Sequence, residues 1–146
     1  MKIAFANDHA AYDVRQALID YIKSLGHSVK DFGWSQNTSC DYPDYAIPAS
    51  ESVAKGESDF GVLLCGSGIG MCIVANKVKG IRAALCWNEE VAKLSRLHNN
   101  ANVLCLPARF LTLEELKKVI AAWLSTPFSN EARHQNRINK IPQGVI

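Results

Sequence analysis

Residues 59–76, DFGVLLCGSGIGMCIVAN, place a thiol directly before a glycine-rich loop. Cys65 ends an apolar run that predicts a strand, and every second residue of the loop 66–70 is glycine before a helix begins. Such a loop can turn its backbone N–H groups into one concavity that suits a phosphate or a developing oxyanion, and Ser67 adds a hydroxyl donor. A thiolate there could act as a proton-abstracting base or a nucleophile. A buried strand-end thiol and a plain tight turn would give the same pattern.

Three stronger motifs for such a loop are absent from the sequence. There is no G-x-x-x-x-G-K-[ST] phosphate loop, and the G-x-G-x-x-G dinucleotide pattern fails because Met71 replaces its last glycine. The Cys-x5-Arg pattern of thiol phosphatases would also need arginine at Met71. The loop alone therefore indicates an anion cradle without selecting a nucleotide.

Asp8 and His9 follow the first apolar run, KIAFA at 2–6. Adjacent residues on an extended segment point to opposite sides, so Asp8 could hold sugar hydroxyls while His9 meets a phosphate or a ring oxygen. Asp8 could equally be the N-cap of the helix that follows.

His98 and Asn99 lie just before the fifth predicted strand, at the end of the sheet opposite to Cys65. They would have to serve a neighbouring molecule unless the preceding helix carries them sideways. The alternative is that they only end a helix and form a turn.

Three arginines are candidates for binding a phosphate. Arg133 and Arg137 are four residues apart on a predicted helix, so their guanidinium groups could clamp a phosphate dianion, although most such pairs are merely solvated. Arg109 follows the fifth predicted strand, at the same end of the sheet as Cys65.

Strands and helices alternate along the chain. Strands are predicted at 2–6, 28–32, 60–64, 81–86 and 103–106, and helices at 10–25, 43–55, after the glycine loop, and at 89–97, 112–124 and 130–140. Short connections predict a Rossmann-like three-layer α/β/α fold with a five-stranded parallel sheet of order 2-1-3-4-5 and a C-terminal helical tail. Ligands would then bind beyond the carboxyl ends of strands one and three, where the strand order reverses.

The composition is that of one ordinary globular domain over 1–146. With 48% hydrophobic residues, 21% charged residues and a net charge of +2, there is no nucleic-acid footprint. No segment has the length of a signal-peptide core or a membrane span, so we expect a cytoplasmic protein with no membrane role. The five cysteines form no C-x-x-C pair, which favours free thiols and disfavours a metal site.

Five segments taken together resemble one family. They are NDHAA at 7–11, DYPDYA at 41–46, CGSGIGMCIVANKVKGIRAALC at 65–86, SRLHNNANVL at 95–104 and ARHQNR at 132–137. The chain is similar over nearly its whole length to the ribose-5-phosphate isomerase B and galactose-6-phosphate isomerase family. The resemblance implies an aldose–ketose isomerase of sugar phosphates that works through an enediol, without a metal or another cofactor. It also implies a dimer that builds each site from both subunits.

The resemblance implies a role for each candidate residue. Cys65 would be the base, His98 would open the furanose ring with help from Asp8, and Ser67 would hold the enediolate with the loop amides. The residues implied to bind substrate are His9, Tyr42, Gly66, Gly68, Ile69, Gly70, Asn99, Arg109, Arg133 and Arg137. The partner subunit would supply five of these residues, namely His98, Asn99 and the three arginines. The tail at 127–146 of each subunit would reach the other subunit.

Several features leave the substrate open. Ala11, Ser67 and the pair Glu131–Ala132 depart from the family's usual residues, and the pair puts a carboxylate beside the arginine clamp. Because Cys65 is present, the chain resembles the branch of the family that uses a cysteine thiol as the base. D-ribose 5-phosphate and D-ribulose 5-phosphate are the expected pair, in a homodimer that could assemble into a tetramer. Allose or galactose 6-phosphate, and a non-catalytic phosphosugar-binding domain, are the alternatives.

Overall fold

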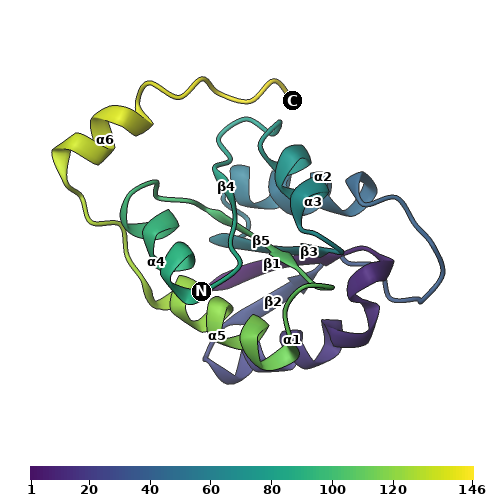
Figure 1. Ribbon diagram of the computed structural model, residues 1–146. Helices are drawn as coiled ribbons and strands as arrows, with labels where there is room; N and C mark the ends of the chain where they lie inside the picture. The colour runs from purple at the N-terminus through teal and green to yellow at the C-terminus, as the bar shows by residue number, and fades with distance from the viewer.

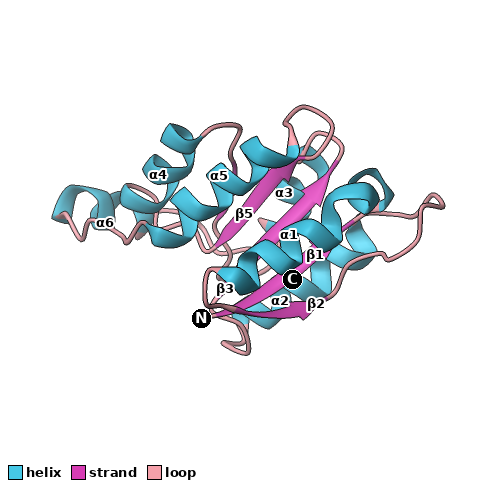
Figure 2. Ribbon diagram, turned by 90° about the horizontal axis from the view of Figure 1, so that it is seen from below, coloured by secondary structure: helices cyan, strands magenta, loops and turns pink.

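A five-stranded parallel sheet lies between two layers of helices (Figures 1 and 2). The computed structural model describes residues 1–146. The strands are β1 (Lys2–Asn7), β2 (Ser28–Asp31), β3 (Phe60–Cys65), β4 (Ala83–Leu85) and β5 (Val103–Pro107). The helices are α1 (Tyr12–Ser24), α2 (Pro43–Ala54), α3 (Ile69–Ala75), α4 (Glu89–Leu97), α5 (Leu113–Ser125) and α6 (Ala132–Ile138), with a 3-10 turn η1 (His9–Ala11). The expected three-layer α/β fold is confirmed.

The strand order is β2-β1-β3-β5-β4, so the expected order 2-1-3-4-5 is wrong at one edge. The reason is the difference in apolar content between the last two strands. All five residues of β5 are buried, whereas the three residues of β4 are only half-buried. A strand with larger side chains gains more from covering on both faces, so β5 takes the inner position beside β3 and β4 becomes the edge.

Alternate residues of the strands feed two hydrophobic cores. Residues such as Phe5 and Leu104 pack on one face against α1, α4 and α5, where Trp123 is fully buried. Residues such as Leu63 and Cys105 pack on the other face against α2 and α3. Both faces of the sheet are covered, as expected of a parallel sheet.

The tail after α5 leaves the two helical layers. It carries α6 beyond the end of α4 and then returns toward the α3–β4 connection (Figure 1). There Val145 N donates to Lys77 O at 2.8 Å and Lys79 N donates to Ile146 O at 2.7 Å. None of the helices combines the length and the apolar character needed to cross a membrane.

Candidate active site

A cleft of about 540 Å³ opens at the carboxyl ends of the central strands. Its lining residues are Asp8, Tyr42, Cys65, Gly66, Ser67, Ile69, Gly70, Ile73, Arg109 and Phe110. The expected convergence of Asp8, which follows β1, with Cys65, at the end of β3, is confirmed. Ile73 and Phe110 were not anticipated, because sequence spacing gives no reason to bring either one to this cleft.

Arg109 lines the cleft of its own chain, which corrects its expected place among the partner's residues. The cause is strand register: Cys65 pairs with Pro107 across β3 and β5, and Gly66 O then accepts from Arg109 N at 3.0 Å. A Cβ atom on Gly66 would lie 3.2 Å from Arg109 Cδ, so the arginine stem packs against the loop.

Cys65 is 5% exposed at the head of the loop, within the cleft. Its carbonyl accepts from Ala108 N at 2.9 Å, so the β3–β5 pairing continues past both strands and fixes the start of the loop. Ser67 Oγ accepts from Ile69 N at 3.3 Å, which leaves the hydroxyl proton available for a ligand.

Gly68 cannot be replaced without moving the loop. Its φ is +74°, and a Cβ atom would stand 2.5 Å from Leu85 Cδ1 and 2.9 Å from the backbone carbon of Leu106. Gly80 has a similar φ of +84° but open space around it. A comparison of alanine substitutions at Gly68 and Gly80 therefore separates the effect of crowding from that of backbone strain.

We expect Gly68→Ala to lower the free energy of unfolding by roughly 1–3 kcal/mol more than Gly80→Ala, because overpacking adds to the strain. Gly80→Ala should cost about 1–2 kcal/mol, the strain of left-handed alanine alone. Urea unfolding of both variants measures the difference. Equal losses would mean that the loop yields to the extra methyl group.

Tyr42 covers the first turn of α3. A Cβ atom on Gly70 would lie 2.7 Å from Tyr42 Cζ, so the phenol ring rests against the glycine. Tyr42 is 38% exposed and lines the cleft, which leaves its face open to a ligand. Glycine at position 70 thus sets how closely this wall of the cleft approaches Cys65.

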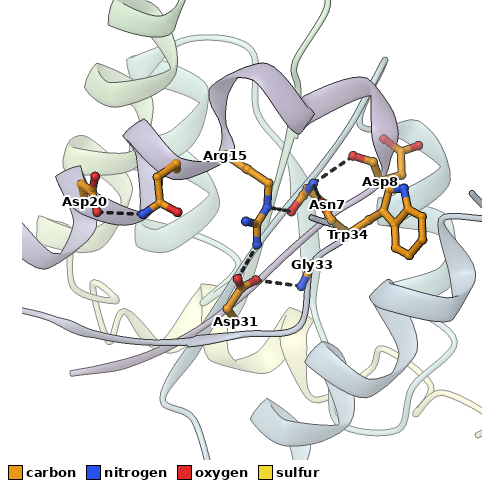
Figure 3. A network of polar contacts seen from close by, with 8 residues as sticks. Asn7, Asp8, Arg15, Asp20, Asp31, Gly33 and Trp34 are labelled. Atoms are coloured by element: carbon orange, nitrogen blue, oxygen red, sulfur yellow. Dashed lines mark hydrogen bonds and ion pairs between the residues drawn. The ribbon is translucent and has the colours of Figure 1, made fainter. Parts of the chain in front are cut away.

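Asp8 is held by a polar network at the end of β1 (Figure 3). Asn7 Nδ2 donates to the carbonyl oxygens of Asp8 and Trp34, both at 2.9 Å. The buried Arg15 donates from Nε to Asn7 Oδ1 at 3.0 Å and pairs with Asp31. These contacts fix the backbone from which the carboxylate of Asp8 enters the cleft.

The two interpretations of Asp8 are compatible. Asp8 Oδ1 accepts from Ala10 N at 2.9 Å and so caps η1, while the side chain lines the cleft. His9 is turned toward Cys40, whose backbone N–H donates to His9 Nδ1 at 3.3 Å. In the neutral ring this bond places the proton on Nε2, which makes that nitrogen a donor for an anion.

A second group of candidates lies at the opposite end of the sheet. His98 is the C-cap residue of α4, and its ring stacks on His134 of α6 with centroids 4.3 Å apart and planes 17° apart. Asn99 O accepts from Arg82 Nε at 3.1 Å, which anchors the turn. His98 therefore does end a helix, which was the alternative to a functional role, and its ring also stacks on His134.

His134 is the residue of this second group that the sequence prediction missed. It is 4% exposed, its Nε2 has no hydrogen-bond partner, and burial lowers its pKa, with the nearby charge of His98 adding to the effect. In the sequence the only signal was a histidine between Arg133 and Arg137, and the seven-residue helix α6 is too short for its periodicity to show which residue is buried.

Arg133 and Arg137 are both exposed on α6. Glu131 Oε2 accepts from Arg133 Nε at 2.9 Å, and this hydrogen bond is the main cause that lowers the pKa of the Glu131 carboxyl. The carboxylate therefore already occupies part of the proposed phosphate clamp.

The two groups do not meet within one chain. At about 3.3 Å per residue, the five-residue strand β5 alone separates its two ends by roughly 15 Å. Cys65 lies level with the carboxyl end of β5, whereas His98 precedes the amino end. Neither group contains three or more His, Cys, Asp or Glu side chains arranged to hold a metal ion.

Comparison with known proteins shows the family of this chain. Residues 3–141 match the family model for ribose/galactose isomerases. The chain belongs to the ribose/galactose isomerase family. Like its relatives, this family member is an isomerase.

Two solved structures and one further relative illustrate the similarity. The type B ribose 5-phosphate isomerase of Trypanosoma brucei shares 42% identity with a TM-score of 0.93, over 95% of each chain. The ribose-5-phosphate isomerase B of Mycoplasma genitalium, solved with bound ribulose-5-phosphate, shares 40% identity with a TM-score of 0.91, over 95% of this family member and 92% of that chain. A D-erythrulose-4-phosphate isomerase of Pectobacterium atrosepticum is 42% identical over 88% of this chain and 85% of its own.

Proposed function

We propose that this isomerase interconverts D-ribose 5-phosphate and D-ribulose 5-phosphate through an enediolate, in a homodimer with two shared sites. The observation that carries the proposal is the division of the candidate residues. Cys65, the glycine loop and Asp8 converge in one cleft, while His98 and the arginine pair lie at the other end of the same chain. A second subunit that places its His98 and its arginine pair at the Cys65 cleft would complete the proposed active site.

Ring opening is the first step. The His98 of one subunit, with Asp8 of the other, moves protons between the anomeric hydroxyl and the ring oxygen of the furanose, which frees the C1 aldehyde. Asp8 is anchored by its cap bond to Ala10 N, so its carboxylate has a fixed position for this task. Stacking on His134 holds the ring of His98 in one plane.

Isomerisation follows on the open chain. The Cys65 thiolate removes the C2 proton, and the electron pair moves onto the carbonyl oxygen at C1 to give the enediolate. The N–H groups of the loop and the Ser67 hydroxyl stabilise that oxygen. Transfer of the hydroxyl proton from O2 to O1 and return of the proton to C1 yield the ketose.

Phosphate binding sets the position of the chain. Nε2–H of His9 and the guanidinium groups of Arg133 and Arg137 bind the phosphate, and Arg109 adds charge from within the cleft. Tyr42 and Asn99 contact the sugar hydroxyls. Because these contacts are remote from C1 and C2, they supply orientation that the proton transfers require.

A coupled isomerase assay in EDTA tests the proposal. Ribose 5-phosphate, allose 6-phosphate and D-erythrulose 4-phosphate are compared, and the five-carbon substrate is expected to give the highest kcat/KM. The relative solved with bound ribulose-5-phosphate supports the five-carbon substrate. The four-carbon sugar is included because another relative is a D-erythrulose-4-phosphate isomerase. A higher kcat/KM for either of the other two sugars would reassign the substrate, and loss of activity in EDTA would remove the metal-independent mechanism.

Glu131 offers a prediction about the phosphate clamp. We expect Glu131→Gln to lower KM for the sugar phosphate severalfold with little change in kcat, because the carboxylate no longer competes for Arg133. Glu114→Gln is the matched control, since Glu114 forms a similar exposed pair with Lys117 on α5. Steady-state kinetics at low ionic strength measures both. An unchanged KM in Glu131→Gln would place Arg133 outside the clamp.

A further inference from the structure

Arg96 is a buried arginine that has no carboxylate partner. It lies in the last turn of α4, two residues before His98, and is 6% exposed. None of the ion pairs in the chain includes it. Its guanidinium carbon instead lies 4.7 Å from the ring centroid of Phe60 and 5.5 Å from that of Trp123. A buried charge is costly unless its donors are satisfied, so the hydrogen bonds of Arg96 hold the groups that accept them firmly.

The turn between α4 and β5 supplies two of these acceptors. Arg96 Nη1 donates to Asn100 Oδ1 at 2.9 Å and also to Ala101 O. Asn100 has a φ of +45°, in the left-handed region that asparagine tolerates better than most residues. A second guanidinium group, that of Arg82, donates from Nη2 to Asn100 O at 3.0 Å. Two arginines therefore fix the turn that begins at His98.

The third acceptor of Arg96 belongs to the tail. Arg96 Nε donates to the carbonyl oxygen of Thr126, which directly follows α5, at 3.1 Å. Three residues later, Ser129 N donates to Leu97 O at 3.2 Å. The tail is thus tied at two points to the end of α4 as it passes on its way to α6 (Figure 1).

These contacts join two parts of the proposed active site within one chain. Arg96 holds both the turn that begins at His98 and the start of the tail that carries Arg133 and Arg137. The stack of His98 on His134 adds a contact at the far end of the same joint. The separation between His98 and the arginine pair therefore does not depend on how two subunits dock.

We propose that Arg96 is a positioning residue that fixes the distance between His98 and the arginine pair, and that this distance selects the length of the sugar phosphate. The inference rests on the proposed function, in which His98 acts at the anomeric end of the substrate and the arginine pair binds the phosphate at the other end. One further carbon adds a bond of about 1.5 Å. Since a misplacement of about 1 Å can cost roughly 10²-fold in rate, a fixed separation discriminates between five and six carbons.

Arg96→Lys is the test variant. Lysine keeps the charge, but its compact ammonium group lacks the planar fork that reaches the turn and Thr126 together. The ratio of kcat/KM for ribose 5-phosphate to kcat/KM for allose 6-phosphate should fall by about fivefold or more from its wild-type value. A purely structural role would lower both constants in proportion and leave the ratio unchanged, which would overturn the proposal.

Hydrogen exchange at the Ser129 amide reports on the joint without any substrate. Exchange in Arg96→Lys should be about tenfold faster than in wild type, because the tail loses its bond to Arg96 while the amide still depends on Leu97 O. Unchanged exchange would also overturn the proposal. If wild type prefers allose 6-phosphate, the proposed substrate is wrong, yet Arg96→Lys should still weaken the preference that wild type shows.

Two further variants complete the experiment. Ser58→Ala is the control for lost stability, since it breaks the buried hydrogen bond to Ser52 Oγ away from the cleft and the tail, and it should keep the wild-type ratio. Ser129→Pro removes the second tie, because proline has no N–H, and it lies on the surface segment between α5 and α6. It should lower the ratio as Arg96→Lys does, so it decides the matter if Arg96→Lys does not fold. A wild-type ratio in Ser129→Pro would mean that the joint does not select substrate length.

Discussion

Cys65→Ala is expected to lower kcat for ribose 5-phosphate by about 10²–10⁴-fold, the usual contribution of a positioned general base. KM should change little, because the proposed phosphate contacts lie on other residues. The reason is geometric: Cys65 lies at the head of the loop, and its carbonyl is tied to Ala108 N. Steady-state kinetics in EDTA, with circular dichroism to verify folding, gives the result.

Cys105→Ala is the matched control for this variant. It deletes the same atom from the neighbouring strand and the same hydrophobic core, but Cys105 does not line the cleft. Its kcat should stay near that of wild type, with a loss of about 1 kcal/mol of unfolding free energy from the cavity. If both variants lose activity equally, packing rather than proton transfer explains the effect, and Cys65 is not the base.

The layers of the fold could be predicted from sequence, and the edge of the sheet could not. Alternating apolar runs and turn residues are local signals, so each strand and helix was found within a few residues. The order of β4 and β5 depends on which strand buries more surface, and alternation carries no information about that. The contrast between AAL in β4 and VLCLP in β5 was the available signal.

The cleft was predictable for a similar reason. Residues that follow parallel strands one and three share one end of the sheet, which placed Asp8 and Cys65 together before any coordinates. The same rule placed Arg109 there, and the structure agrees, whereas the family resemblance suggested the partner. His134 required the structure, because a stacking contact between α4 and α6 depends on how the tail folds back.

A mixed dimer of Cys65→Ala and His98→Ala subunits is expected to recover activity that neither homodimer has. In a two-fold dimer with shared sites, one site receives both wild-type groups and the other receives both defects. A heterodimer purified through two different tags should therefore show about half of the wild-type kcat per dimer with ribose 5-phosphate.

The control for this experiment pairs Cys65→Ala with Asp8→Ala, because both residues line the same cleft. Every site in that heterodimer carries one defect, so its activity should not exceed the mean of the two homodimers. Sites contained within single chains would leave both mixed dimers without a wild-type site. Recovery in the Cys65→Ala and His98→Ala heterodimer, without recovery in the control heterodimer, requires that Cys65 and His98 act across the interface. Verified heterodimers that show no recovery would refute the shared site. The isomerase could then bring His98 to Cys65 only by a rearrangement of the tail and α4.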